Sequence, residues 1–204
     1  MHSLQIEPIR EPMVLNLNPI VRRQINDADF LRLCQRNEAC RIEMSKEGVI
    51  EIMPPTGGES GHRNAQLGRW LGNWAEESGT GLDFDSSTIF KLPNDAKRSP
   101  DASWVRKEIW EMLTEEEREG FPPICPNFVI ELRSSTDRLQ PLKDKMQEYL
   151  DNGAELGWLI DPIERKVYVY RSGVPVECLD NPETLSGDPF LLGFVLPVAR
   201  LWSK

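Results

Sequence analysis

The spacing of hydrophobic residues along the chain predicts alternating helices and short strands. The clearest helix covers residues 60–77, where Leu67, Trp70, Leu71 and Trp74 recur at intervals of three and four positions and form one apolar stripe. Further helices are predicted at residues 25–37, with Asn26 or Asp27 as the N-cap, at 114–118, and from between Asp137 and Pro141 to about Asp151. Strands are predicted at residues 41–45, 49–53, 81–85, 88–92, 101–105, 127–133, 156–160 and 166–171, with a weak one at 174–178.

Two of these strands, 127–133 and 156–160, are dominated by apolar residues on both faces. This pattern is typical of strands in the centre of a sheet that helices cover on both sides. A helix separates the two strands, so the run from 127 to 160 predicts an α/β protein. Residues 1–24 are proline-rich and predict an extended arm, whereas residues 25–204 contain no linker and predict a single domain.

Composition removes several classes of chemistry. The longest apolar runs are far shorter than a membrane span, and the N-terminus lacks the apolar core of a secretory signal, so we expect a cytoplasmic protein with no membrane partner. The chain has only two histidines, and its four cysteines form no Cys-x-x-Cys pair, which argues against a zinc site. No Gly-x-Ser-x-Gly turn presents a serine nucleophile. Any catalysis must therefore rest on carboxylates, lysine and arginine.

Two acidic residues stand out as candidates for such chemistry. Glu131 lies inside an apolar strand, where an ionised carboxylate needs a salt bridge, a raised pKa or a bound cation. The simplest interpretation of the strand alone is a salt bridge to Arg133, two residues later on the same face. Asp101 heads another short strand after Pro100. Its simplest interpretation is an aspartate that caps a turn.

The helix after Glu131 adds two candidate lysines. Its buried face is formed by residues 139, 142, 146, 149 and 150, and Lys143 and Lys145 flank that stripe on opposite sides. Either side chain can reach over the sheet edge towards the carboxylates. The periodicity does not choose between them, and a solvated lysine beside the core is the simpler interpretation of each.

Two carboxylates and a lysine near the ends of adjacent elements suit metal-assisted phosphodiester hydrolysis. Acidic oxygens hold Mg²⁺, which retains several waters and contacts the scissile phosphate. The lysine orients or deprotonates the attacking water and offsets developing charge. This chemistry requires neither histidine nor cysteine.

Four segments carry a resemblance to a known family. They are residues 97–104 (Lys-Arg-Ser-Pro-Asp-Ala-Ser-Trp), 126–134 (Pro-Asn-Phe-Val-Ile-Glu-Leu-Arg-Ser), 145–149 (Lys-Met-Gln-Glu-Tyr) and 157–162 (Gly-Trp-Leu-Ile-Asp-Pro). In this order they resemble the Uma family of restriction-type endonucleases, abundant in cyanobacteria, within the PD-(D/E)XK nuclease superfamily. The resemblance extends from about Ile25 to Trp202 and includes the Pro-Pro-Thr-Gly-Gly element at 54–58. It implies a restriction-endonuclease-like core, with a central mixed sheet flanked by helices.

The resemblance also implies roles for individual residues. Asp101 and Glu131 match the two metal ligands, with Mg²⁺ as the expected cofactor and Mn²⁺ as a substitute. The superfamily's usual lysine position holds Arg133, a poor base because its guanidinium stays protonated. In the Uma family the lysine lies on the following helix, ahead of a tyrosine, and this position is Lys145. The family often has proline after the first serine of the intervening loop, where this chain has Ser134-Ser135-Thr136. Auxiliary candidates are Glu59, His62, Arg133 and Gln147.

The predicted function is thus an Mg²⁺-dependent endonuclease that hydrolyses DNA, expected to act as a homodimer because two strands need two cuts. The net charge of -9 and the pI near 4.9 count against it. They favour a second hypothesis, an inactive binding or assembly protein with a nuclease fold in which Arg133 neutralises Glu131. An RNA or nucleotide phosphodiesterase is a third. A local basic rim would reconcile the acidic charge with DNA binding, and its candidates are Arg63, Arg69, Arg98 and Arg106.

Overall fold

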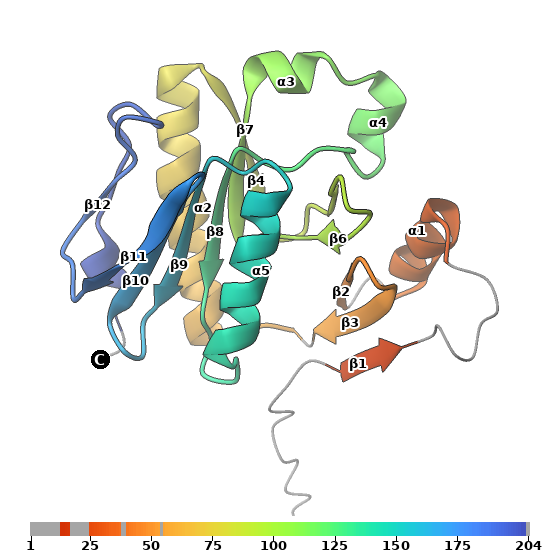
Figure 1. Ribbon diagram of the computed structural model, residues 1–204, viewed down its shortest axis with the longest axis horizontal. Coiled ribbons are helices and arrows are strands. Elements are labelled where there is room, and N and C mark those ends of the chain that lie inside the picture. The colour runs from red at the N-terminus through yellow and green to blue at the C-terminus, as the bar shows by residue number, and fades with distance from the viewer. Residues whose placement is uncertain (1–12, 17–24, 38–39, 54, 203–204) are drawn as a thin grey trace, which may run out of the picture.

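The computed structural model describes residues 13–16, 25–37, 40–53 and 55–202. Its centre is a six-stranded sheet in the order β11-β10-β9-β8-β7-β4 (Figure 1). Strands β8 and β9 are parallel, and every other neighbouring pair in this sheet is antiparallel. The strands are β4 (Gly81–Asp85), β7 (Ala102–Arg106), β8 (Phe128–Leu132), β9 (Leu156–Asp161), β10 (Lys166–Arg171) and β11 (Val174–Asp180).

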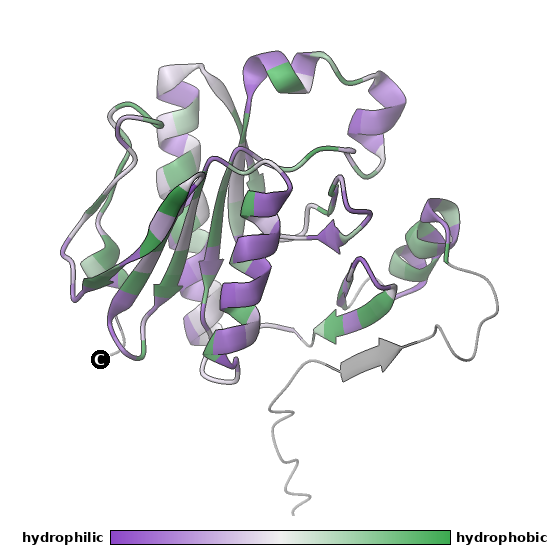
Figure 2. Cartoon of the chain, in the orientation of Figure 1, coloured by the Kyte–Doolittle hydropathy of each residue, from purple (hydrophilic) through white to green (hydrophobic). Residues whose placement is uncertain are grey.

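Two helices cover opposite faces of this sheet. On one face, α2 (Gly58–Ser78) packs Leu67 and Leu71 against a core that includes Trp104 and Ile130. On the other, α5 (Leu139–Asp151) packs Met146 and Tyr149. In Figure 2 green is prominent along the strands of the central sheet, interrupted by purple and white segments, whereas much of α5 is purple, as expected for a helix with one exposed face. Apolar residues at alternate positions of β8 therefore face different helices, which explains why the strand is apolar on both sides.

A second sheet lies beside α5 (Figure 1). Its order is β1-β3-β2-β6-β5, and α1 (Asp27–Arg36) packs Phe30 against the buried Ile42 and Ile50. The side chain of Asn26 caps α1 by accepting a hydrogen bond from the Asp29 amide. The strands are β1 (Met13–Asn16), β2 (Arg41–Met44), β3 (Val49–Met53), β5 (Phe90–Lys91) and β6 (Lys97–Arg98). The chain passes from this sheet to the central one between β6 and β7, so Asp101 lies at the junction of the two sheets.

The remaining elements complete the core. Short helices α3 (Lys107–Glu111) and α4 (Glu115–Glu119) follow β7, and Thr114 forms a capping box with Glu117. Near the C-terminal end, β12 (Leu185–Ser186) pairs with β13 (Val195–Leu196), and a 3-10 helix, η1 (Val198–Leu201), follows. Among the residues described above, no helix is both long and apolar enough to cross a membrane.

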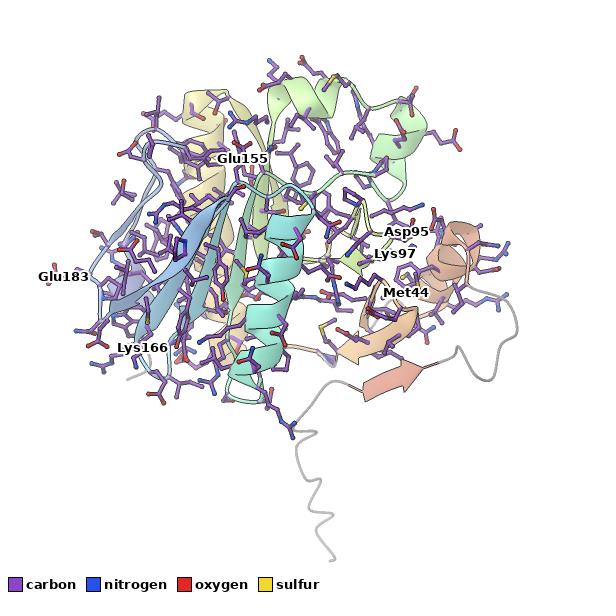
Figure 3. The ribbon with its side chains drawn as sticks, in the orientation of Figure 1. Met44, Asp95, Lys97, Glu155, Lys166 and Glu183 are labelled. Atoms are coloured by element: carbon purple, nitrogen blue, oxygen red, sulfur yellow. The ribbon has the colours of Figure 1, made fainter. Side chains whose placement is uncertain are left out.

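The predicted α/β fold with a mixed sheet and flanking helices is confirmed. The sequence patterns did not predict the short elements α3, β6, β12, β13 and η1, and β6 shows why. Residues 93–97 read as a polar turn, yet Lys97 is 1% exposed and pairs with Met44 of β2 (Figure 3). Its ammonium lies 2.9 Å from Asp27 and 5.4 Å from the centroid of the Phe30 ring. These contacts offset the free-energy cost of burying the charged Lys97 side chain. The expected arm at 1–24 lies outside the described residues, except for β1.

Candidate active site

Asp101 and Glu131 lie side by side at the ends of two neighbouring strands. Asp101 directly precedes β7, and Ala102 of β7 pairs with Ile130 of β8 in antiparallel register, which places the two acids opposite each other. The Asp101 Oδ2 atom accepts a hydrogen bond of 2.8 Å from the Leu132 amide. Glu131 is 2% exposed, and its Oε1 atom accepts a hydrogen bond of 3.0 Å from the Tyr149 hydroxyl. Both carboxylates are therefore held by the central sheet and α5.

The structure separates the two candidate lysines. The Lys145 Nζ atom lies 2.8 Å from Glu131 Oε1 and 2.9 Å from Glu43 Oε1. The Lys143 Nζ atom lies 3.9 Å from the centroid of the Tyr168 ring. The crossover that makes β8 and β9 parallel places one flank of α5 towards the second sheet, and Lys145 is on that flank. Of these two lysines, Lys145 contacts Glu131, and Lys143 lies over the ring of Tyr168 in β10.

The expected salt bridge between Glu131 and Arg133 is wrong. The Arg133 amide donates a hydrogen bond of 2.9 Å to the Ile160 carbonyl, so the register with β9 continues past Leu132 and brings Arg133 beside Asp161. The Arg133 Nη1 atom instead lies 2.7 Å from Asp161 Oδ2, and its Nε donates to the Asp137 carbonyl at 3.2 Å. Arg133 thus ties the start of the loop after β8 to the end of β9.

Three more charged residues complete the cluster: Arg41 and Glu43, which the sequence did not single out, and Arg98, which was a candidate for the basic rim. The Arg41 Nη1 atom lies 2.8 Å from Asp101 Oδ1, and Glu43, two residues later, is 1% exposed. Arg98 lies 2.6 Å from Glu148, 3.2 Å from Glu51 and 3.3 Å from Glu43. Strand alternation does place Arg41 and Glu43 on one face of the hairpin, but it does not reveal that this face meets α5.

The auxiliary candidates lie away from this cluster. Glu59 has a side chain that is 77% exposed and lies 3.5 Å from Arg63, and exposed His62 lies 3.1 Å from the Gln66 amide. Exposed Gln147 donates to Asp151 at 2.8 Å. From the same turn of α2 as His62, Asn64 approaches Asp101, with its Nδ2 atom 3.5 Å from Oδ1. The start of α2 therefore borders the acidic pair through Asn64.

The expected basic rim does not form as a unit. Arg98 is 7% exposed and lies inside the cluster. Arg106 is at the opposite end of β7 from Asp101, where its guanidinium pairs with Glu155 and lies over Phe190. Arg98 and Arg106 therefore do not belong to one exposed basic surface around Asp101.

Burial and neighbouring charges move the pKa values of two carboxyl groups in opposite directions. Burial is the largest effect on Glu131 and raises its pKa to about 7. Attraction to Lys145 and Arg41 lowers this pKa, and repulsion from Asp101 and Glu43 raises it. Burial acts the same way on Glu43, but Lys145, Arg41 and Arg98 overcome it and lower the pKa to about 2. Glu43 is therefore ionised at neutral pH, whereas Glu131 takes up a proton near neutral pH.

These pKa values predict a stability maximum on the acid side of neutrality. Since the pKa of Glu131 is about 7 in the folded protein and about 4.5 when unfolded, its destabilising effect should disappear as pH falls from 7 to 4.5. The pKa of Glu43 is shifted downwards, so its stabilising effect should disappear as pH falls from 4.5 to about 2. Thermal unfolding without divalent ions should show both limbs. Glu131→Gln should flatten the upper limb, and an unchanged upper limb in that variant would contradict the assignment.

The donor set fits a hydrated divalent cation. Within the described ranges, no three histidine, cysteine or acidic side chains converge as a metal centre, and Mg²⁺ typically takes only one or two carboxylates and several waters. No described residue donates a hydrogen bond to the Oε2 atom of Glu131, and Asn64 Oδ1 is a buried oxygen with no hydrogen-bond partner. The linked cluster also has more acidic than basic side chains: Glu43, Glu51, Asp101, Glu131 and Glu148 against Arg41, Arg98 and Lys145.

A mixed sheet between α2 and α5, with two acids at adjoining strand ends and a lysine from the next helix, defines a nuclease fold of the restriction-endonuclease-like class. The family model Uma2, described as "Putative restriction endonuclease", matches residues 27–199, and the chain belongs to this family. The fold is similar to that of a protein described as a "putative nuclease belonging to DUF820" from Anabaena variabilis ATCC 29413. That structure has 23% sequence identity and a TM-score of 0.65, and the match covers 79% of this chain and 89% of the other. No curated protein matches the chain significantly.

Proposed function

We propose that the protein is a divalent-metal-dependent endonuclease that hydrolyses phosphodiester bonds in DNA. The observation that carries this proposal is the position of Lys145, whose Nζ atom lies 2.8 Å from Glu131 while Asp101 occupies the neighbouring strand end. Membership in a family described as "Putative restriction endonuclease" supports the same reaction class. The three side chains supply the acidic oxygens and the cation that this hydrolysis requires.

Asp101 and Glu131 are the residues that would hold Mg²⁺, with Mn²⁺ as a substitute. The bound cation supplies Lewis-acid stabilisation of phosphoryl oxygens and lowers the pKa of a coordinated water. The Leu132 amide fixes the orientation of Asp101 through its 2.8 Å hydrogen bond. Tyr149 fixes Glu131 through Oε1 and leaves Oε2 directed elsewhere. The Leu132 amide of β8 and the Tyr149 hydroxyl of α5 therefore hold the two carboxylates in position before an ion binds.

Lys145 acts as a cation and hydrogen-bond donor. Burial alone lowers the pKa of its ammonium, but Glu131 and Glu43 raise that pKa above the ordinary value. A protonated lysine cannot accept a proton, so its contribution is to orient the attacking water and to stabilise the charge that develops on the phosphate. This role refines the sequence-based expectation of either positioning or activating the water.

DNA is the proposed polymer, and a homodimer is the proposed assembly. Local potentials, rather than the net charge of -9, govern a single cleft, and a bound dication reverses the local sign. The hypothesis of an inactive binding protein is less well supported than the nuclease hypothesis. It required Arg133 to neutralise Glu131, but Arg133 pairs with Asp161. RNA and nucleotide substrates are outcomes of the test below.

The test is metal-dependent cleavage by the wild-type protein. Supercoiled and linear DNA, single-stranded DNA, RNA and a small nucleotide phosphodiester would be incubated with Mg²⁺ or Mn²⁺, and products would be separated by electrophoresis or, for the nucleotide, by chromatography. We expect internal cleavage of DNA that EDTA abolishes and excess Mg²⁺ restores, because the carboxylates hold the ion reversibly. Cleavage of RNA alone would change the substrate class. Absence of both dication binding by calorimetry and cleavage of every polymer would favour the binding protein.

A further inference from the structure

Glu43 is a buried carboxylate to which the proposed hydrolysis has so far assigned no role. It belongs to β2 in the second sheet, whereas Glu131 and Lys145 belong to β8 and α5. The Lys145 ammonium lies 2.9 Å from Glu43 Oε1 and 2.8 Å from Glu131 Oε1. Lys145 is thus held between carboxylates that come from two different sheets.

The oxygens of Glu43 are already occupied by donors. In addition to Lys145, Oε1 accepts a hydrogen bond of 3.2 Å from the Ser99 amide and lies 3.2 Å from Arg41 Nη2. Oε2 lies 3.3 Å from Arg98 Nη1. An ionised carboxylate offers about four acceptor sites, so these contacts use nearly all of its capacity. Glu43 is therefore better suited to hold neighbouring side chains than to bind a cation or a substrate.

We propose that Glu43 is the positioning residue for Lys145 and that the hairpin of β2 and β3 is consequently part of the active site. This inference rests on the proposed nuclease function. A lysine side chain has many rotamers, and an anchor on each side restricts its ammonium to one place. The ammonium has three N–H donors; it donates one hydrogen bond to Glu43 and forms an ion pair with Glu131. This leaves N–H capacity on Lys145 for the attacking water or a phosphate oxygen.

The chain offers a matched control for removal of the Glu43 charge. Glu51 also lies near Arg98, at 3.2 Å, but belongs to β3 and makes no contact with Lys145. We expect Glu43→Gln to reduce kcat by about 10- to 100-fold with little change in KM, because an ammonium displaced by about 1 Å loses alignment. Glu51→Gln should change kcat far less. Equal losses in the two variants would reduce Glu43 to a general structural role and overturn the proposal.

A double-mutant cycle distinguishes positioning of Lys145 from an independent effect. If Glu43 acts through Lys145, Glu43→Gln should cause no further loss of kcat in a Lys145→Met background. Losses that multiply in the double variant would overturn the proposal. The cycle uses full-length protein whose folding is checked by circular dichroism.

A measurement without catalysis keeps this inference separable from the proposed function. Acetylation of Lys145 by a small anhydride, followed by mass spectrometry, reports the accessibility of its ammonium, with Lys143 as the internal reference. We expect Glu43→Gln to increase labelling of Lys145 several-fold relative to Lys143, and Glu51→Gln to leave the ratio unchanged. An unchanged ratio in Glu43→Gln would show that Glu43 does not hold Lys145. If the wild type cleaves no nucleic acid, the nuclease proposal fails, and the labelling ratio still decides the positioning.

Discussion

Replacement of Asp101 by asparagine is expected to reduce metal-dependent DNA cleavage by about 10⁴-fold, which corresponds to about 5 kcal/mol of transition-state stabilisation. Asparagine has nearly the same shape, and its carbonyl oxygen can still accept the hydrogen bond from Leu132. The change therefore removes one negative charge from the acidic pair without removing the packing. Initial rates of plasmid cleavage, together with titration calorimetry of Mn²⁺, would measure the two consequences. Both cleavage and dication binding should fall.

Asp85 provides the matched control for this experiment. It lies on β4 opposite Ala102, one strand away from Asp101, and its carboxylate accepts hydrogen bonds from Ser87 and Thr88. Asp85→Asn should leave dication binding and cleavage at the wild-type level. Glu131→Gln should behave as Asp101→Asn does. Wild-type cleavage by Asp101→Asn would remove Asp101 from the site and with it the proposed metal ligation.

Replacement of Arg98 by methionine is expected to cause the largest loss of stability, about 3–5 kcal/mol in the free energy of unfolding. The Arg98 guanidinium has a side-chain exposure of 9% and contacts carboxylates of Glu43, Glu51 and Glu148. Methionine fills a similar volume but leaves these carboxylates without their shared cation. Urea denaturation followed by tryptophan fluorescence would measure the change at neutral pH.

Arg171→Met tests whether the loss at Arg98 reflects burial. Arg171 pairs with Glu177 at 3.0 Å, but both side chains are at least 40% exposed, so its loss should cost about 1 kcal/mol or less. Similar losses for the two variants would contradict the role of Arg98 as a buried hub. The cost of Arg98→Met should also shrink as the pH is lowered, because protonation relieves the uncompensated carboxylates.

Local patterns predicted the centre of the molecule well. Continuous apolar residues at 127–133 and 156–160 gave β8 and β9, and the stripe on residues 60–77 gave α2. Gly79, which follows the predicted helix and ends α2, has φ of 62°, a backbone conformation that glycine adopts without strain. These elements are decided by short-range spacing and burial, which a sequence displays directly.

The second sheet and its charges were harder to predict because they depend on contacts between remote segments. Lys97 reads as part of a polar turn until Asp27 and Phe30 are placed against it. The helical wheel orders Lys143 and Lys145 around the α5 axis, but the direction of that axis over the sheet decides which lysine meets Glu131. The resemblance to the Uma family chose Lys145, and its position beside Glu131 agrees with that choice. Glu43 could not be recognised as a site residue from the sequence, because it has no distinctive spacing and does not stand in a long apolar strand as Glu131 does.

The ion pair between Glu43 and Lys145 has a consequence for how the protein folds. The two residues are 102 positions apart, whereas β8, α5 and β9 are consecutive and form a local unit. Contacts between distant positions form late because the loop that they close is long. A nascent chain should therefore assemble the β8–α5–β9 unit before the two sheets dock, and docking adds the second of the two carboxylates that restrain the lysine. Recovery of enzyme activity during refolding should accordingly lag behind recovery of helical circular dichroism.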